Sequence, residues 1–284
     1  MFQIDRELFK HLSSAQNQIV KKIRTLQSSG IRAAKSRHQD HLALIDGVHL
    51  IQSWNLAKNA ETRIKSIFTT ESGLQQNEVV NLLRGIFNSK SSSEIHFYLI
   101  EESLWRELSD LDNAPHILGL VSIPEAKKLP ELNEDCIILD AIQDSGNVGS
   151  ILRTAAAAGF RKIICIKGTA QVWSPKVLRS GMGAHTALEI FEGVEGAECL
   201  AKVHSRLLTT QLHGNISLYK LKNQLSESVA WIFGNEGSGV SQEFIERSCG
   251  VLIPQEQAVE SLNVSAAAAI CLFETRRIRL EALG

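Results

Sequence analysis

The stretch IPQEQAVESLNVSAAAAICLFE, residues 253–274, joins the end of an apolar segment, a polar loop and the start of an alanine-rich helix. Ser261 and Asn263 stand where that helix begins. Either residue can act as a helix N-cap, because its side-chain oxygen accepts a bond from a free main-chain N–H. The alternative is that these polar groups are presented to a ligand at the mouth of the loop.

Upstream of this stretch, apolar segments alternate with helical patterns. This alternation predicts an α/β fold with a mostly parallel sheet that helices cover on both faces. In such sheets ligands bind at the carboxyl ends of strands. We expect strands at 136–142, 162–166, 188–191, 207–212, 229–234 and 250–254, and helices at 148–158, 175–180, 198–207, 242–247 and after 263.

The N-terminal part predicts a smaller α/β unit. Residues 1 to 30 read as one helix from the spacing of their apolar residues, followed by strands at 42–47, 63–70 and 95–100 and helices at 48–60 and 77–87. The charged, proline-containing segment 122–135 reads as a linker. Because the 284 residues exceed the usual size of one domain, we predict an N-terminal domain at 1–125, a linker at 126–135 and a C-terminal domain at 136–284.

Composition excludes several protein classes. With 44% hydrophobic and 21% charged residues, the chain is neither disordered nor fibrous. The apolar run Val264 to Phe273 is about half of the roughly 20 residues that a membrane helix needs, and the N-terminus has no signal-peptide pattern, so a cytoplasmic protein is expected. The five cysteines form no CxxC pair and several lie in apolar runs, so we expect reduced core residues and no metal site.

Although the net charge is only −1, the charges are unevenly distributed: the segment between Leu8 and Gln39 is basic and has no acidic residue. Two interpretations remain open for it: a solvated helix face, or an arm that contacts nucleic-acid phosphates. For the second, the predicted RNA-binding residues are Lys21, Lys22, Arg24, Arg32, Lys35 and Arg37.

Three expected strand ends carry unusual loops, DSGNVGSILRTAAAAGF (144–160), FGNEGSGVS (233–241) and IPQEQAVESLNVS (253–265). Each alone is compatible with a plain turn or a helix cap. Neither GxGxxG nor GxxxxGK[ST] occurs, which disfavours a nicotinamide or P-loop site. A nucleotide-dependent oxidoreductase is therefore the weakest of the functional hypotheses.

Together, these loops resemble the three motifs of the SpoU (TrmH) family of RNA ribose 2′-O-methyltransferases, in the SPOUT superfamily. The matching residues are N-x-G-x-x-x-R-T-x-x-x-x-G at 147–159, GNEGSG at 234–239 and IP followed by ESLNVSAAAA at 253–269, and SPKVLRSGMGAH at 174–185 resembles a further family helix. The resemblance implies an S-adenosylmethionine site in a trefoil knot, a homodimer through the C-terminal domain, and an RNA substrate, ribosomal RNA before transfer RNA. It also implies that the N-terminal unit is a substrate-binding domain like a small RNA-binding ribosomal protein.

The resemblance also implies roles for individual residues. Arg153 would grip a phosphate and stabilise the developing alkoxide, since a guanidinium holds its protons too firmly to act as a base. The implied catalytic residues are Arg153, Glu236, Ser261, Asn263 and Asn147, and the implied cofactor-binding residues are Thr210, Gln211, Gly234, Asn235, Gly237, Ile253 and Leu262. The family usually has Met and Gly where this chain has Gln255 and Gln257. An RNA-binding module that keeps this fold without activity is the alternative, and the presence of the implied catalytic residues favours an enzyme.

Overall fold

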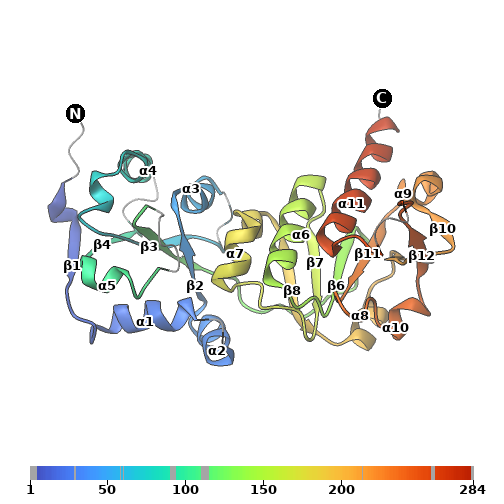
Figure 1. The fold of residues 1–284 in the computed structure, drawn as a ribbon, viewed down its shortest axis with the longest axis horizontal. Coiled ribbons are helices and arrows are strands. Elements are labelled where there is room, and N and C mark those ends of the chain that lie inside the picture. The colour runs from blue at the N-terminus through green and yellow to red at the C-terminus, as the bar shows by residue number, and fades with distance from the viewer. Residues whose placement is uncertain are drawn as a thin grey trace. The chain divides into compact units, whose positions relative to one another are not determined.

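The structure is a computed structural model that describes residues 5–28, 30–57, 59, 61–89, 94–109, 115–212, 214–256 and 260–282. The chain folds into two compact units. The first holds Met1–Glu125 together with Trp173–Thr186, and the second holds Ala126–Val172 and Ala187–Gly284. Each unit is built on its own sheet (Figure 1).

The described part of the first unit contains a five-stranded sheet in the order β1-β4-β3-β5-β2. Strands β1, β4 and β3 run parallel, while β5 is antiparallel to both of its neighbours. The strands are β1 (Phe9–Leu12), β2 (Leu42–Asp46), β3 (Ile64–Thr69), β4 (His96–Ile100) and β5 (Ile117–Ser122). The helices are α1 (Gln18–Gln27), α2 (Ile31–Asp40), α3 (Val48–Leu56), α4 (Asn77–Phe87), α5 (Glu102–Trp105) and α7 (Pro175–Gly181), with short 3-10 turns at Arg6–Leu8, Gly73–Gln75 and Ala184–Ala187.

The expected continuous helix over residues 1 to 30 is wrong. Residues 9–12 form strand β1, which pairs with β4 in parallel and sets the ring of Phe9 edge-on against that of Phe97 at 5.7 Å. Helix α1 begins only after Asn17, whose side chain caps it by accepting from the main-chain N–H of Ile19. The apolar spacing suited a helix locally, but pairing with a distant strand decided the conformation.

Four further helices and strands of this unit were not expected there. Helices α2 and α5 and strand β5, which lies between β3 and β2, were missed. Helix α7 was expected as a helix, but its segment packs within the first unit: Trp173 and Trp54 both lie against the buried ring of His185. This grouping differs from the predicted division at 126–135, and the roles assigned to the domains stay predictions.

The described part of the second unit contains a seven-stranded sheet in the order β10-β12-β9-β11-β6-β7-β8. All pairings between these named strands are parallel, which confirms the expected sheet type. Helices α6 and α11 lie on one side of it and α8 and α10 on the other (Figure 1). The strands are β6 (Cys136–Asp140), β7 (Lys162–Ile166), β8 (Glu189–Val194), β9 (Arg206–Thr210), β10 (Ile216–Ser217), β11 (Val229–Gly234) and β12 (Cys249–Leu252). The helices are α6 (Ser145–Ala158), α8 (Gly196–Lys202), α9 (Lys222–Leu225), α10 (Gln242–Ile245) and α11 (Val264–Glu281), with a 3-10 turn at Leu218–Lys220.

Burial explains why these strands are continuous apolar runs. Every residue of β6 and β11 is buried, as expected for the centre of a sheet that is covered on both faces. The segment expected as a linker is packed as well, since Leu129 and Leu132 belong to the core of this unit. Of the cysteines, Cys249 is partly exposed and the other four are buried, and burial raises the pKa of the Cys199 thiol to about 12. Among the described residues, no helix combines the length and the apolar character that crossing a bilayer requires.

Candidate functional site

A cavity of about 520 Å³ lies at the carboxyl edge of the second sheet, where β9, β11 and β12 end. Its size is typical of a small-molecule site. All seven of the implied cofactor-binding residues line it: Thr210, Gln211, Gly234, Asn235, Gly237, Ile253 and Leu262. The lining also includes Glu236, Ser261 and Asn263, so residues from two of the three motif loops and from the end of β9 meet around one space.

The loop after β11 has a tight turn that depends on Gly234. Asn235 and Gly239 exchange two main-chain hydrogen bonds of 2.9 Å each, which folds the loop back on itself. A methyl group on Gly234 would lie 2.3 Å from main-chain atoms of Gly239 and Val240, so only glycine fits. The side chain of Asn235 accepts from the N–H groups of Gly237 and Ser238 and donates to the carbonyl of Ala141. Close main-chain packing therefore explains Gly234 of the GNEGSG motif, and the hydrogen bonds within the loop explain Asn235.

A chain of side-chain hydrogen bonds joins all three motif loops. Asn147 donates from Nδ2 to Glu236 Oε1 at 3.0 Å. Asn263 donates from Nδ2 to Asn147 Oδ1, also at 3.0 Å. The other amide atom of Asn263 caps α11 by accepting from the N–H of Ser265 at 2.9 Å. Asn263 is thus both a helix cap, which confirms the first explanation offered for it, and a tie to the first motif; its presentation to a ligand stays a prediction.

The Glu236 carboxylate is held in its ionised form. Its two oxygens accept from the main-chain N–H groups of Gln143 and Asp144 at 3.2 Å, in addition to the bond from Asn147. Partial burial acts to raise the pKa of Glu236, but these hydrogen bonds outweigh burial and hold the pKa below its ordinary value. At neutral pH the site therefore contains a fixed negative charge beside the first motif.

Arg153 and Ser261 stand outside this network. Arg153 is exposed on α6, six residues beyond Asn147, which turns it by about 240° and moves it by about 9 Å along the helix. Within the described part of the chain, no hydrogen bond or ion pair engages the Arg153 guanidinium, and Arg153 does not line the cavity. The side chain of Ser261 lines the cavity but has no hydrogen bond to another described residue.

The predicted RNA-binding cations on α1 and α2 divide into three groups. Arg37 is 1% exposed and donates to the carbonyls of Leu26 and Ser28, so it ties the two helices together and is not available to a phosphate. Lys22 and Arg24 pair with Asp40 and Glu107, respectively. The remaining predicted cations, Lys21, Arg32 and Lys35, are exposed and have no ion pair within the described residues.

Three polar residues of the cavity were not among the predicted site residues: Ser238, Glu260 and Gln255, the last of which the sequence had marked only as a departure from the family pattern. Gln255 Nε2 donates to the carbonyl of Glu260 at 3.3 Å. Glu260 stands next to Ser261 in the ESLNVS motif, so its position beside a predicted site residue was the available signal. Gln257, the other departure from the family pattern, lies outside the described residues.

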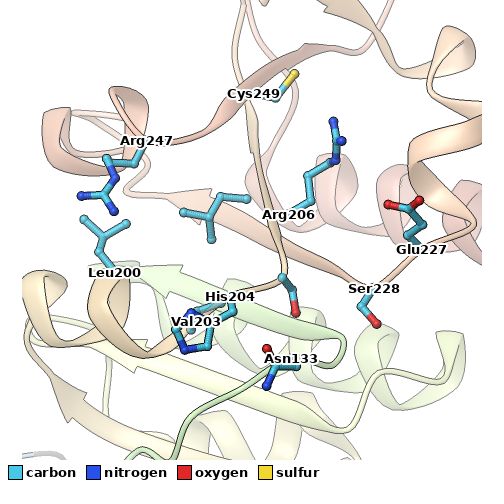
Figure 2. A pocket seen from close by; sticks show the side chains of 11 residues that line it. Asn133, Leu200, Val203, His204, Arg206, Glu227, Ser228, Arg247 and Cys249 are labelled. Atoms are coloured by element: carbon cyan, nitrogen blue, oxygen red, sulfur yellow. The ribbon is translucent and has the colours of Figure 1, made fainter.

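A second depression, of about 660 Å³, lies at the opposite, amino edge of the same sheet. Figure 2 shows Arg206 and Cys249 at the starts of β9 and β12, with Arg247 and Glu227 on either side. None of the predicted site residues lines it. It is open and shallow, and we assign no part of the chemistry to it.

Comparisons with known proteins agree with this geometry. The model of the SpoU rRNA Methylase family matches residues 135–273. The 23S rRNA (guanosine(2553)-2′-O)-methyltransferase RlmP of Bacillus subtilis is 28% identical over 94% of this chain and 99% of its own. The 23S rRNA (guanosine-2′-O-)-methyltransferase RlmB of Neisseria meningitidis serogroup B is 34% identical over 69% of this chain and 82% of its own. The SpoU methyltransferase AviRb of Streptomyces viridochromogenes, in complex with AdoMet, shares the fold at 21% identity, with a TM-score of 0.75 over 93% of this chain and 100% of its own.

Proposed function

We propose a function from one premise: the chain belongs to the SpoU rRNA methylase family. The protein is an RNA 2′-O-ribose methyltransferase that uses S-adenosylmethionine. One observation supports the assignment of specific residues: every implied cofactor-binding residue lines the carboxyl-edge cavity. Asn147, which donates to Glu236 and accepts from Asn263, joins this cavity to the first motif. Relatives named as 2′-O-methyltransferases favour an enzyme over an inactive RNA-binding module.

The cavity suits S-adenosylmethionine. Leu262, Ile253 and Val240 offer an apolar wall for a purine, and main-chain groups at Thr210, Gly234 and Ile253 offer donors and acceptors at its rim. Gly234 keeps the rim open, because a side chain there would collide with the returning loop. When bound, S-adenosylmethionine supplies an electrophilic methyl group.

Arg153 acts on the RNA. Its guanidinium binds two oxygens of a phosphate in a planar fork and stabilises the negative charge that develops on the ribose oxygen. It is exposed, and no residue in the described segments competes for it, which supports a role toward an external anion.

Glu236, Asn147 and Asn263 hold the loops in place. In this network the side-chain amides of Asn147 and Asn263 each donate one hydrogen bond and accept another, which fixes their orientation. The loops are therefore preorganised before ligands bind. Ser261, which has no partner for its hydroxyl among the described residues, offers that hydroxyl to the cofactor or the ribose.

A homodimer through the second unit completes the site. Arg153 lies on α6 away from the cavity of its own protomer, and α6 packs against α11, on which Phe273 is 47% and Leu280 is 54% exposed. Covering this apolar surface brings Arg153 of one protomer to the cavity of its partner. The same proposal includes a trefoil knot around the segment between β12 and α11. It also includes a cytoplasmic location, where RNA and S-adenosylmethionine are both present.

The dimer is tested by light scattering and by mixing. Arg153→Ala and Gly234→Ala proteins should each have strongly reduced activity alone, whereas a heterodimer of the two co-expressed chains should retain one intact composite site and regain activity. A monomeric mass for an active enzyme, or no recovery in the mixture, contradicts the dimer.

Ribosomal RNA is the proposed substrate, because RlmP and RlmB act on 23S rRNA. Lys21, Arg32 and Lys35 of the first unit supply phosphate contacts. The decisive experiment maps 2′-O-methyl groups in total RNA with and without the gene, and then repeats the map with the gene encoding Arg153→Ala. A ribosomal site that disappears in both strains supports the proposal, whereas an unchanged map contradicts it.

A further inference from the structure

The carboxyl-edge cavity has an unbalanced charge. Two carboxylates, those of Glu236 and Glu260, belong to residues that line it, and none of the described lining residues is Lys, Arg or His. The neighbouring residues 257–259 are outside the described residues but are uncharged by sequence. His213, which follows Leu212 of the lining, also lies outside them, and above about pH 7.5 an ordinary histidine is neutral.

The reaction changes the charge of the ligand. Transfer would form a bond between the ribose 2′-oxygen and the methyl carbon and break the bond from that carbon to sulfur, leaving the electron pair on sulfur, while the hydroxyl proton would be released to solvent. The sulfonium becomes a neutral thioether, so the cofactor has a net charge of about +1 and the product, S-adenosylhomocysteine, is neutral overall at pH 8.

We propose that Glu260 is a specificity-determining residue that, with Glu236, makes the cavity prefer the cationic cofactor over its neutral product. This inference rests on the proposed function and adds a regulatory consequence to it. The preference lowers product inhibition, because methyl transfer itself removes the charge that the cavity favours.

The surroundings of the two carboxylates support this role. Glu236 is held ionised by its hydrogen bonds, and its pKa lies below the ordinary value. Glu260 is exposed, and within the described part of the chain no cation pairs with its carboxylate. Its main chain is anchored, since the carbonyl accepts from Gln255, so the charge stays near the rim. With partial screening by solvent, one such charge at the rim of a site changes the affinity for a cation by about three- to tenfold.

The test compares two ligands on two matched variants. Affinities of S-adenosylmethionine and S-adenosylhomocysteine are measured by titration calorimetry at pH 8, for wild type, Glu260→Gln and Glu256→Gln. Glu256 is an exposed acid of the same loop that does not line the cavity, so its variant removes a nearby charge without touching the site. Melting temperatures confirm that all three proteins fold.

We expect Glu260→Gln to weaken S-adenosylmethionine by about three- to tenfold, or about 0.7 to 1.4 kcal/mol, and to leave S-adenosylhomocysteine within about twofold. Glu256→Gln should change neither, and added salt should narrow the wild-type preference. Equal weakening of both ligands means that Glu260 only shapes the cavity, and no weakening means that its charge is irrelevant; either result overturns the inference. A wild-type protein that binds neither ligand overturns the proposed function instead.

Discussion

At the carboxyl edge of the second sheet, polar side chains bond to one another around a cavity, whereas on α1 and α2 several cations bond to acids and carbonyls of their own unit. Both regions were predicted to be functional. The first prediction rested on residues at fixed spacing in three loops, and the second on a count of charges. Residues at fixed spacing reflect required main-chain conformations, such as the tight turn at Gly234. The charges of a basic segment, in contrast, can simply form ion pairs within the fold. The motifs were therefore the stronger guide to a site.

The largest expected effect comes from Arg153→Ala. Turnover should fall about a hundred- to a thousandfold, because removing one preorganised donor costs about 2.7 to 4 kcal/mol in the transition state. Folding and cofactor binding should stay nearly intact, since Arg153 does not line the cavity. Turnover, melting temperature and cofactor affinity are measured on the same protein.

Arg153→Lys is the matched variant for this prediction. It should restore little activity, because an ammonium keeps the charge but lacks the planar fork. A variant that loses turnover only in step with stability would show that Arg153 belongs to the fold and not to the reaction.

Gly234→Ala should destabilise the protein by about 1 to 3 kcal/mol, because the added methyl overlaps the main chain of Gly239 and Val240. The melting temperature and the affinity for S-adenosylmethionine should fall together. Gly237→Ala is the control, since the nearest atom to its new methyl is Asn235 Oδ1 at 3.5 Å. Equal losses in the two variants would contradict the special role of the turn.

Asn147→Ala should remove the bridge between Glu236 and Asn263, at a cost of about 1 to 3 kcal/mol. The pKa of Glu236 should rise toward its ordinary value, because one of the hydrogen bonds that lower it is gone. A carboxylate whose pKa is lower in the folded protein than in the unfolded protein stabilises the fold at pH values above its unfolded-state pKa. This stabilisation is lost as the pH falls through the folded-state pKa. The variant should therefore lose less of its stability in acid than wild type does.

Melting temperatures between pH 3 and pH 7 check this prediction. Gln143→Ala serves as the control, because Gln143 bonds to Glu236 through its main-chain N–H, which the substitution keeps. An acid dependence that is the same in wild type and Asn147→Ala would rule out the bridge as the cause of the lowered pKa.

The smallest effect is expected on the basic helices. Replacing Lys21, Lys22 and Arg24 with Gln should flatten the log–log salt dependence of RNA binding by about 0.7 to 0.9 for each RNA phosphate that the variant no longer neutralises. Because Lys22 and Arg24 already pair with Asp40 and Glu107, Lys21→Gln alone should give most of the change. Lys167→Gln, which removes an ion-paired lysine of the second unit, is the control. An unchanged slope in the triple variant would leave the segment as a solvated face.

Much of the second unit could be predicted because its central strands are continuous apolar runs bounded by glycine-rich loops. The residues of β7 and β11 were predicted with the bounds that the structure shows, and α4 of the first unit was predicted equally well. Strand β1 was mistaken for helix because the apolar spacing of its four residues fits both helical and strand periodicity. The strand β10 was missed because two residues are too few to show any periodicity.

The sequence by itself determined where β7 and β11 begin and end and which polar loops follow the strands of the second sheet, because burial imposes a pattern that repeats over a few residues. It also determined that Asn263 begins a helix, because capping is a contact between near neighbours. Only the tertiary structure decided that Asn147 meets Glu236, 89 residues away, and Asn263, 116 residues away. It also decided that Arg37 is buried while Lys21 stays exposed. A hydrogen bond acts over about 3 Å, so its partners are chosen by how strands pair and helices pack, and no local pattern of residues records that choice.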